Sequence, residues 1–222
     1  PEGVCRITYG QSPDADVQLL HSQVEDWSTT VIIQTTIGTI QATIPVPGDF
    51  MALNACAAVA VGLAAGVNSE TIEQGLENYT PVGMRMRLET AGHIRIINDA
   101  YNANPLSMKA ALTTLAAQST PHKVAFLGDM LEMGSAETSG HQEVLVHALE
   151  LNLPIGLVGP RFVSAWNTLR SRYPSAEIIC QTEHSDQVLE YWNIPPEPTT
   201  ILLKGSRGMK MEQMSTQLQE RF

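Results

Sequence analysis

Residues 93–117 read HIRIINDAYNANPLSMKAALTTLAA, and this stretch decides the fold of most of the chain. Its apolar beginning, residues 93–98, predicts a buried strand, and residues 106–117 predict a helix because Ala and Leu dominate them. The polar loop 99–105 joins the two. A strand followed by a loop and a helix is the unit from which parallel sheets covered by helices are built.

The same unit recurs as far as the carboxyl terminus. Short apolar runs predict strands at residues 123–127, 155–158, 177–180 and 200–203, and helices are predicted at residues 138–151, 162–172, 185–192 and 209–219. Short apolar strands of this kind are buried on both faces of a parallel sheet. We therefore predict the α/β class, with a Rossmann-like domain whose mainly parallel sheet carries helices on both faces. In such domains, ligands bind at the carboxyl ends of the strands.

The residues before this alternation follow another pattern. Residues 4–46 alternate apolar and polar positions in short runs separated by turn residues, which predicts an antiparallel β-meander. An Ala-rich stretch at residues 52–65 predicts a buried helix, and residues 69–79 predict an amphipathic helix.

Pro81 and Gly83 interrupt the pattern and mark a boundary. We predict a first part at residues 1–80, a linker at residues 81–85 and a carboxyl-terminal domain at residues 86–222. The chain begins without an initiator Met, so we expect it to be an internal fragment of a longer protein.

The charge balance limits the partners that we expect. With 13 Lys and Arg against 23 Asp and Glu, the formal net charge is -10. Such a field repels nucleic-acid backbones and anionic lipid surfaces, so neither is an expected partner. The most apolar stretch, residues 53–67, is shorter than the roughly 20 residues that a membrane-spanning helix needs. We expect no membrane insertion.

Cysteine and histidine spacing gives no sign of a metal site. Cys5, Cys56 and Cys180 are far apart and odd in number, which predicts neither a disulfide framework nor a zinc site and fits a reducing cytoplasm. The six histidines, among them His141 and His147, are not at metal-ligand spacing. The sequence also contains no GxxxxGK[ST] phosphate loop and no GxGxxG, GxSxG or HExxH motif.

Three polar loops directly follow predicted strands, at residues 99–105, 128–134 and 204–208. In the first loop, the Asp99 carboxylate can accept hydrogen bonds from two neighbouring hydroxyls, as a ribose presents them. Asn104 precedes Pro105, so it is either a binding residue or the cap of the next helix.

The other two loops carry charged side chains. Lys204 and Arg207 flank Gly205 and Ser206 just before a predicted helix, which indicates either a seat for a carboxylate or phosphate or a solvated basic turn. Asp129, in the second loop, could order a cation together with Glu132, or cap the helix that follows, and capping is the favoured reading.

Several stretches closely resemble the Mur ligase family: IINDAYNANPLSM at residues 96–108, LGDMLEMG at residues 127–134 and LKGSR at residues 203–207. The YNANP signature is similar to that of the branch that adds D-alanyl-D-alanine. Upstream, NACAA at residues 54–58 and the Pro-x-x-x-Arg-Met join at residues 81–86 also resemble the family. The resemblance therefore covers essentially the whole chain.

The resemblance implies a three-domain enzyme with a UDP-sugar domain, a central ATP-binding domain and a Rossmann-like carboxyl-terminal domain. Residues 1–80 would be the tail of the central domain. The implied reaction uses ATP and Mg²⁺ to activate UDP-N-acetylmuramoyl-tripeptide as an acyl phosphate, which the amine of D-alanyl-D-alanine then attacks. Because the phosphate loop is missing, we expect no turnover from this chain alone, and we expect the Mg²⁺ ligands mainly in the amino-terminal portion.

The resemblance also implies roles for individual residues. Asp99 would bind the ribose, Arg85 the phosphates and Asn54 the adenine side, and Tyr101, Asn102 and Asn104 would line the nucleotide side of the cleft. Lys204, Ser206 and Arg207 would face the dipeptide and the reacting carboxylate, with Lys204 and Arg207 as the catalytic residues. One departure is Gly48-Asp49-Phe50-Met51, where the family usually has Gly-x-His-Asn.

Two other readings compete with a ligase. A non-catalytic Rossmann-like binding or interaction module is the alternative, and an oxidoreductase is weaker because the glycine fingerprint after the first strand is missing. For the ligase we expect a monomer.

Overall fold

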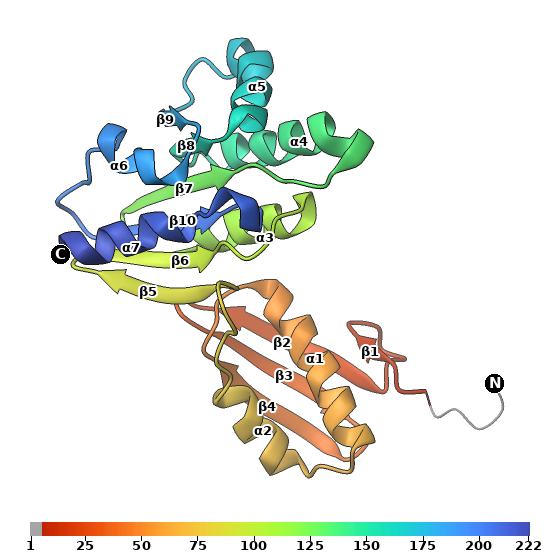
Figure 1. Cartoon of the computed structure of the whole chain (residues 1–222). Coiled ribbons are helices and arrows are strands. Elements are labelled where there is room, and N and C mark those ends of the chain that lie inside the picture. Colours follow the sequence, from red (N-terminus) through yellow and green to blue (C-terminus); the bar gives the residue numbers. More distant parts are fainter. Residues whose placement is uncertain (1–5) are drawn as a thin grey trace. The chain divides into compact units, whose positions relative to one another are not determined.

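The computed structural model describes residues 6–222 (Figure 1). It divides into two compact units, Pro1–Thr80 and Pro81–Phe222. The boundary between the units falls where the sequence places the first residue of the predicted linker.

The first unit contains a four-stranded sheet in the order β1-β2-β3-β4. Its strands are β1 (Tyr9–Gly10), β2 (Val17–Val24), β3 (Thr29–Thr35) and β4 (Gly38–Ile44). The pairs β2-β3 and β3-β4 are antiparallel, but β1 pairs with β2 in parallel, so the predicted antiparallel meander is wrong for the first strand. The reason is local: Asp16 accepts hydrogen bonds from the backbone N–H and the hydroxyl of Thr8, which turns the intervening loop back on itself.

Two helices complete the first unit, α1 (Asp49–Ala64) and α2 (Ser69–Glu77). Alternate strand residues such as Val31, Ile33 and Ile40 are fully buried, as the period of two predicts. The amphipathic helix α2 begins after Asn68, whose side chain accepts a hydrogen bond from the backbone N–H of Thr71 at 2.8 Å.

The second unit contains a six-stranded sheet in the order β5-β6-β10-β7-β8-β9. Its strands are β5 (Arg87–Ala91), β6 (Ile94–Asp99), β7 (His122–Gly128), β8 (Ile155–Val158), β9 (Ile178–Thr182) and β10 (Thr199–Lys204). All neighbouring pairs are parallel except β5-β6. The predicted α/β class with a mainly parallel sheet is confirmed, although the sequence analysis missed the edge strand β5.

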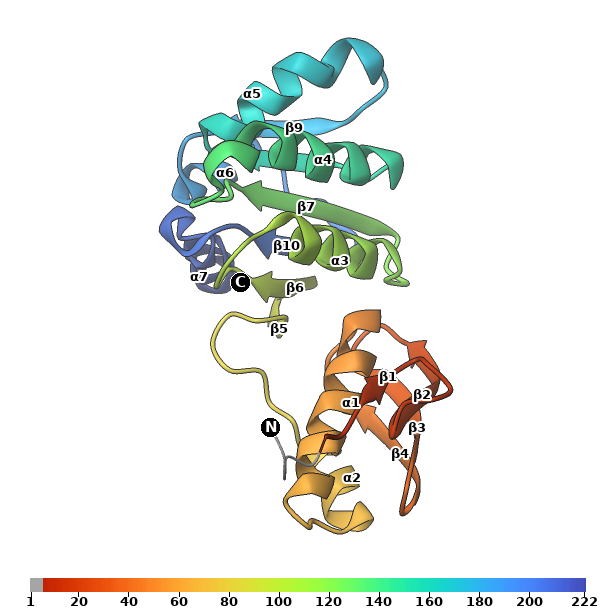
Figure 2. The same ribbon diagram turned by 90° about the vertical axis from the view of Figure 1, so that its right-hand side faces the viewer.

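Helices cover both faces of this sheet (Figure 2). They are α3 (Pro105–Ala116), α4 (Glu137–Glu150), α5 (Pro160–Leu169), α6 (Val188–Tyr191) and α7 (Glu212–Arg221), with α3, α4 and α5 on one face and α6 and α7 on the other. The helix predicted at residues 209–219 starts later than expected because Lys210 has a left-handed backbone, with φ of 50°. On the face of α7, Met214 and Leu218 pack into a core with Phe126, Ile201 and Leu203.

The topology determines where the three polar loops lie. Strand β10 lies between β6 and β7, and Lys204 is in register with Asp99 on one side and Leu127 on the other. Because the three strands are parallel, the loops that follow them meet at one edge of the sheet, which we call the carboxyl edge.

Candidate functional site

The carboxyl edge is organised around a buried ion pair. The side chain of Lys204 is only 2% exposed, and its Nζ atom donates a hydrogen bond to Asp99 Oδ2 at 2.6 Å. The same Nζ atom lies 3.0 Å from the backbone oxygen of Asn102 and 3.5 Å from that of Asp99. A side chain predicted to face substrate is therefore turned inward toward the first loop.

Asp99 is held on both carboxylate oxygens. Its Oδ1 atom accepts a hydrogen bond from the backbone N–H of Met86 at 3.0 Å, and Met86 itself has a left-handed backbone with φ of 52°. Burial raises the pKa of the Asp99 carboxyl, while Lys204, the Met86 N–H and Arg85 act in the opposite direction. Each oxygen has a second lone pair, so the carboxylate can still accept hydrogen bonds from a ligand.

Arg85 and Tyr101 form a pair beside Asp99. The guanidinium carbon of Arg85 lies 4.2 Å from the centre of the Tyr101 ring, within the range of a cation–π interaction. Tyr101 is 44% exposed and its backbone N–H donates to the oxygen of Met84 at 3.0 Å. The structure thus brings a cation, an aromatic ring and a carboxylate together at the start of the first loop.

The two asparagines of this loop make local hydrogen bonds. Asn104 Oδ1 accepts from the backbone N–H of Ser107 at 2.9 Å, and the Ser107 hydroxyl accepts from the Asn104 N–H, so Asn104 caps α3. Asn102 Oδ1 accepts from the backbone N–H of Ala103 at 2.8 Å. Of the two readings of Asn104, the structure displays the cap, and nucleotide contacts by either residue stay a prediction.

The second and third loops are joined through Ser206. The hydroxyl of Ser206, a residue that is 4% exposed, accepts a hydrogen bond from the backbone N–H of Leu131 at 2.8 Å. The backbone N–H of Ser206 donates to the oxygen of Asp129 at 3.0 Å. Ser206 therefore ties two loops together in this structure.

Asp129 is a helix cap, but not for the helix that follows it. Its carboxylate is fully buried and accepts hydrogen bonds from the backbone N–H groups of Arg161 and Phe162, both at 3.0 Å, at the start of α5. The expectation of a cap for the next helix, α4, is wrong because β8 pairs with β7, so the helix that follows β8, which is α5, starts beside Asp129 at the end of β7. A carboxylate at a helix N-terminus is stabilised by the unpaired N–H groups there.

Two glycines make this close approach possible. A Cβ atom on Gly159 would lie 2.5 Å from the Asp129 carboxylate, and the φ of Gly159 is +105°. A Cβ atom on Gly205 would lie 2.8 Å from the Cα atom of Gly128. The strand ends at this edge pack so closely that side chains are excluded at both positions.

Arg207 points outward, in contrast to the other charged and polar residues of its loop. Its side chain is 58% exposed, and Nη1 pairs with Glu212 Oε1 at 2.5 Å. The same Nη1 atom lies 3.5 Å from the sulfur of Met84. Among Lys204, Ser206 and Arg207, it is the guanidinium of Arg207 that reaches solvent.

Asn54 lies in the first unit, where it borders an apolar pocket. The pocket has a volume of about 320 Å³ and lies among α1, α2 and β4; its lining residues are Ile44, Met51, Asn54, Ala55, Ala58, Ile72, Gly75, Leu76 and Tyr79. Asn54 is exposed, and its Nδ2 atom contacts the Met51 sulfur at 3.9 Å. Tyr79, 40% exposed, places an aromatic ring at the rim.

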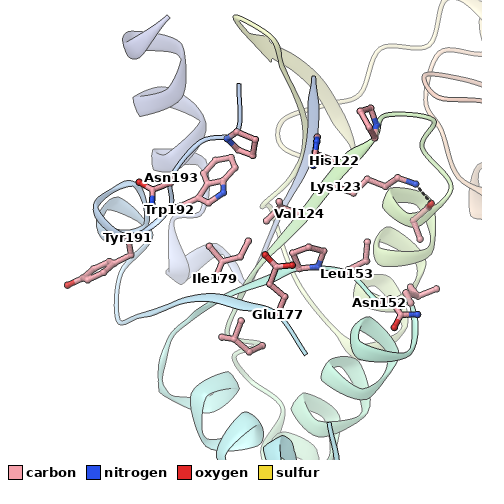
Figure 3. Close-up of a pocket in the computed structure, with 16 residues that line it drawn as sticks. His122, Lys123, Val124, Asn152, Leu153, Glu177, Ile179, Tyr191, Trp192 and Asn193 are labelled. Atoms are coloured by element: carbon pink, nitrogen blue, oxygen red, sulfur yellow. Dashed lines mark hydrogen bonds between the residues drawn. The ribbon is translucent and has the colours of Figure 1, made fainter. Parts of the chain in front are cut away.

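A separate pocket lies at the opposite, amino edge of the six-stranded sheet (Figure 3). It has a volume of about 560 Å³ and is lined by the first residues of β7 and β9 together with residues 151–154, 191–193 and 195. His122, Lys123 and Glu177 are among its charged or titratable residues, and none of the predicted site residues lies in it.

Within residues 6–222, no group of three or more His, Cys, Asp or Glu side chains is arranged to hold a metal ion. No helix in the same range is both long and apolar enough to cross a membrane.

The sequence and the structure both match known proteins. Residues 84–207 match the family described as "Mur ligase, glutamate ligase domain". The UDP-N-acetylmuramoyl-tripeptide–D-alanyl-D-alanine ligase of Bacillus subtilis is 33% identical over 96% of this chain and 47% of the relative. The enzyme of the same name from Escherichia coli is 29% identical over 94% of this chain and 46% of the relative. This chain thus spans about half the length of these relatives.

Solved structures show the same fold. A crystal structure of MurF from Acinetobacter baumannii, 29% identical, superimposes with a TM-score of 0.83 over 96% of this chain and 46% of that one. MurF from Thermotoga maritima, described as a complex with ADP, is 18% identical and has a TM-score of 0.78 over 97% of this chain and 49% of that one, which shows a shared fold alone. Because the family description matches more than half of its residues, the chain belongs to the Mur ligase family.

Proposed function

We propose that this chain is the carboxyl-terminal half of an ATP-dependent ligase that joins D-alanyl-D-alanine to UDP-N-acetylmuramoyl-tripeptide, in cytoplasmic peptidoglycan precursor synthesis. The observation that carries the proposal is the Asp99 carboxylate at a strand end beside Arg85, in a chain 33% identical to a ligase of that name. Residues 1–80 are then the tail of a central ATP-binding domain, residues 81–85 a linker and residues 86–222 the carboxyl-terminal domain of a monomeric enzyme.

The nucleotide is held by the first loop and its neighbour Arg85. The free lone pairs of Asp99 accept the two hydroxyls of the ribose, since both oxygens already have fixed protein donors and so a fixed direction. The Arg85 guanidinium, oriented by the Tyr101 ring, binds the phosphates. Asn102 and Asn104 stand in the same loop and complete the nucleotide side.

As the resemblance implies, we assign Asn54 of the first unit to the adenine side, since its amide both donates and accepts hydrogen bonds. The pocket that it borders has a volume of about 320 Å³ and an apolar lining. Tyr79 at the rim provides a ring surface. Phe50 stands where the family usually has a histidine, so Asn54 is the amide that this chain offers on the adenine side.

The chemistry proceeds in two steps. An oxygen of the tripeptide carboxylate attacks the γ-phosphorus of ATP, the bond to the bridging oxygen breaks, and ADP leaves. The amine of D-alanyl-D-alanine then attacks the acyl carbon, forming the amide as phosphate and one amine proton leave. Negative charge develops in both steps, and the exposed Arg207 guanidinium is the group of the third loop that can stabilise it.

Mg²⁺ would neutralise the phosphates during transfer. The described residues hold no cluster of carboxylate, histidine or cysteine ligands that fits it. We derive no step through the metal, and the resemblance implies that its ligands lie mainly in the amino-terminal portion of the relatives.

The test is phosphate release by a protein in which this chain follows the amino-terminal half that its relatives carry. We expect release that requires ATP, UDP-N-acetylmuramoyl-tripeptide and D-alanyl-D-alanine together, with mass-spectrometric detection of the UDP-N-acetylmuramoyl-pentapeptide. Free D-alanine in place of the dipeptide is the control. No pentapeptide with all three substrates would refute the proposed function.

A further inference from the structure

The ammonium group of Lys204 donates its hydrogen bonds to acceptors inside the protein. A lysine ammonium carries three donors, and here three acceptors surround it: Asp99 Oδ2 at 2.6 Å and the backbone oxygens of Asn102 at 3.0 Å and Asp99 at 3.5 Å. The side chain is 2% exposed. An incoming carboxylate would have to displace one of these partners from a site that water barely reaches.

The acceptors of Lys204 all belong to the first loop. Two of them come from Asp99, at the last position of β6, and the third is the carbonyl of Asn102, three residues on. Strand β10 carries Lys204 in register with Asp99, so the pairing is built into the sheet. The ammonium therefore sets the path of the loop and the direction in which the free lone pairs of Asp99 point.

Arg207 provides the contrast within the same loop. Its side chain is 58% exposed, and its pairing is with Glu212 on the following helix, not with the first loop. The two cations of the third loop therefore point in different directions: Lys204 faces the first loop and Arg207 faces solvent.

We infer that Lys204 is a positioning residue, which aligns Asp99 and the Asn102 carbonyl for the nucleotide and does not contact the dipeptide or the acyl phosphate. This inference rests on the proposed function and changes one of the roles that the resemblance implies. It predicts that removing the Lys204 charge affects the kinetic parameter that Asp99 controls.

The first experiment is a double-mutant cycle in the complete ligase. Lys204→Met should raise the KM for ATP about tenfold, the size expected when a charged hydrogen bond of about 1.4 kcal/mol is lost, and leave the KM for D-alanyl-D-alanine within about twofold. Asp99→Asn should do the same, and the double variant should be no worse than the more severe single variant. Lys204→Arg should recover part of the ATP affinity.

Two matched variants sharpen the readout. Arg207→Met should change the dipeptide KM or kcat, and Lys123→Met, at the opposite edge of the sheet, should change neither KM. A Lys204→Met enzyme with a raised dipeptide KM and an unchanged ATP KM would overturn the positioning role.

A second measurement does not depend on turnover. In the 222-residue chain, carboxyl ¹³C NMR of Asp99 should show that Lys204→Met moves the titration of this carboxyl to higher pH, because a buried carboxylate loses its cation. An unchanged Asp99 titration would overturn the inference even if the ligase assay succeeds. A shifted titration together with an inactive complete protein would refute the proposed function and leave the pairing established.

Discussion

The carboxyl edge of the six-stranded sheet is closed by hydrogen bonds, whereas the amino edge opens into a pocket of about 560 Å³ (Figure 3). At the closed edge, Lys204, Ser206 and Asp129 are nearly or fully buried and each has fixed partners. At the open edge, His122 and Glu177 are exposed. The pocket and the hydrogen-bonded polar side chains therefore lie at opposite ends of the same strands. Polar groups with fixed directions are what a site for charged substrates needs, which supports the proposal that the chemistry takes place at the closed edge.

The largest effect should come from removing the cap at the closed edge. Asp129→Ala leaves the N–H groups of Arg161 and Phe162 without their acceptor and opens a cavity, so we expect the free energy of unfolding to fall by about 4 kcal/mol. Urea unfolding of the 222-residue chain measures this. The matched control is Glu177→Ala in the open pocket, which should change stability by less than about 0.5 kcal/mol. Equal losses at the two edges would break the comparison.

A pair of lysines tests the same contrast with one type of side chain. Lys204→Met leaves the Asp99 carboxylate without its cation, and we expect a loss of about 3 kcal/mol, as for other broken buried pairs. Lys123 is partly buried and donates one hydrogen bond to the oxygen of Ala116 at 2.7 Å, so Lys123→Met should cost about 1 kcal/mol. Chemical denaturation at one pH and one salt concentration compares them. If Lys123→Met lowered the free energy of unfolding as much as Lys204→Met, the predicted contrast between the two edges would be contradicted.

The sequence predicts where the closed edge lies, but it does not predict which side chains contact each other there. Parallel strands bring their following loops together, so the meeting of the three polar loops could be deduced from the strand and helix pattern. The partners could not: Lys204 pairs with Asp99, 105 positions earlier, and Asp129 caps a helix 32 positions later. Such pairs depend on the order of strands in the sheet, which local periodicity does not contain.

The missed strand β5 has a similar cause. Residues Arg87–Ala91 form an edge strand with mixed exposure, so they lack the apolar run that marks the central strands. Their strand conformation comes from antiparallel pairing with β6, across a turn at Gly92. Helix limits were off by a few residues where backbone geometry intervened, as at Lys210.

Two residues with left-handed backbones give a smaller test of the two edges. Lys210 follows the third loop with φ of 50°, and Asn152 lines the open pocket with φ of 53°. Lysine tolerates this conformation less well than asparagine, so Lys210→Gly should raise the free energy of unfolding by about 0.5 kcal/mol, and Asn152→Gly by less. Thermal unfolding of both variants checks the order. A larger gain at Asn152 would indicate that the strain lies at the open edge.

The smallest expected effect is a change in how stability depends on pH. Since burial raises the pKa of Asp99 in the folded state, ionisation of this carboxyl is less favourable there than in the unfolded chain. Its contribution to stability is therefore complete below its ordinary pKa of 3.8 and is lost as the pH rises through the folded-state value.

Asp99→Asn removes this contribution to the pH dependence, so between about pH 4 and about pH 7 the variant should lose less stability, or gain more, than the wild type. Urea midpoints across this range measure the difference in slope. Glu177→Gln at the open edge is the control and should follow the wild-type curve. If the Asp99→Asn curve also ran parallel to the wild-type curve, ionising the carboxylate at the closed edge would cost no more than ionising one at the open edge. The two edges would then differ in packing alone.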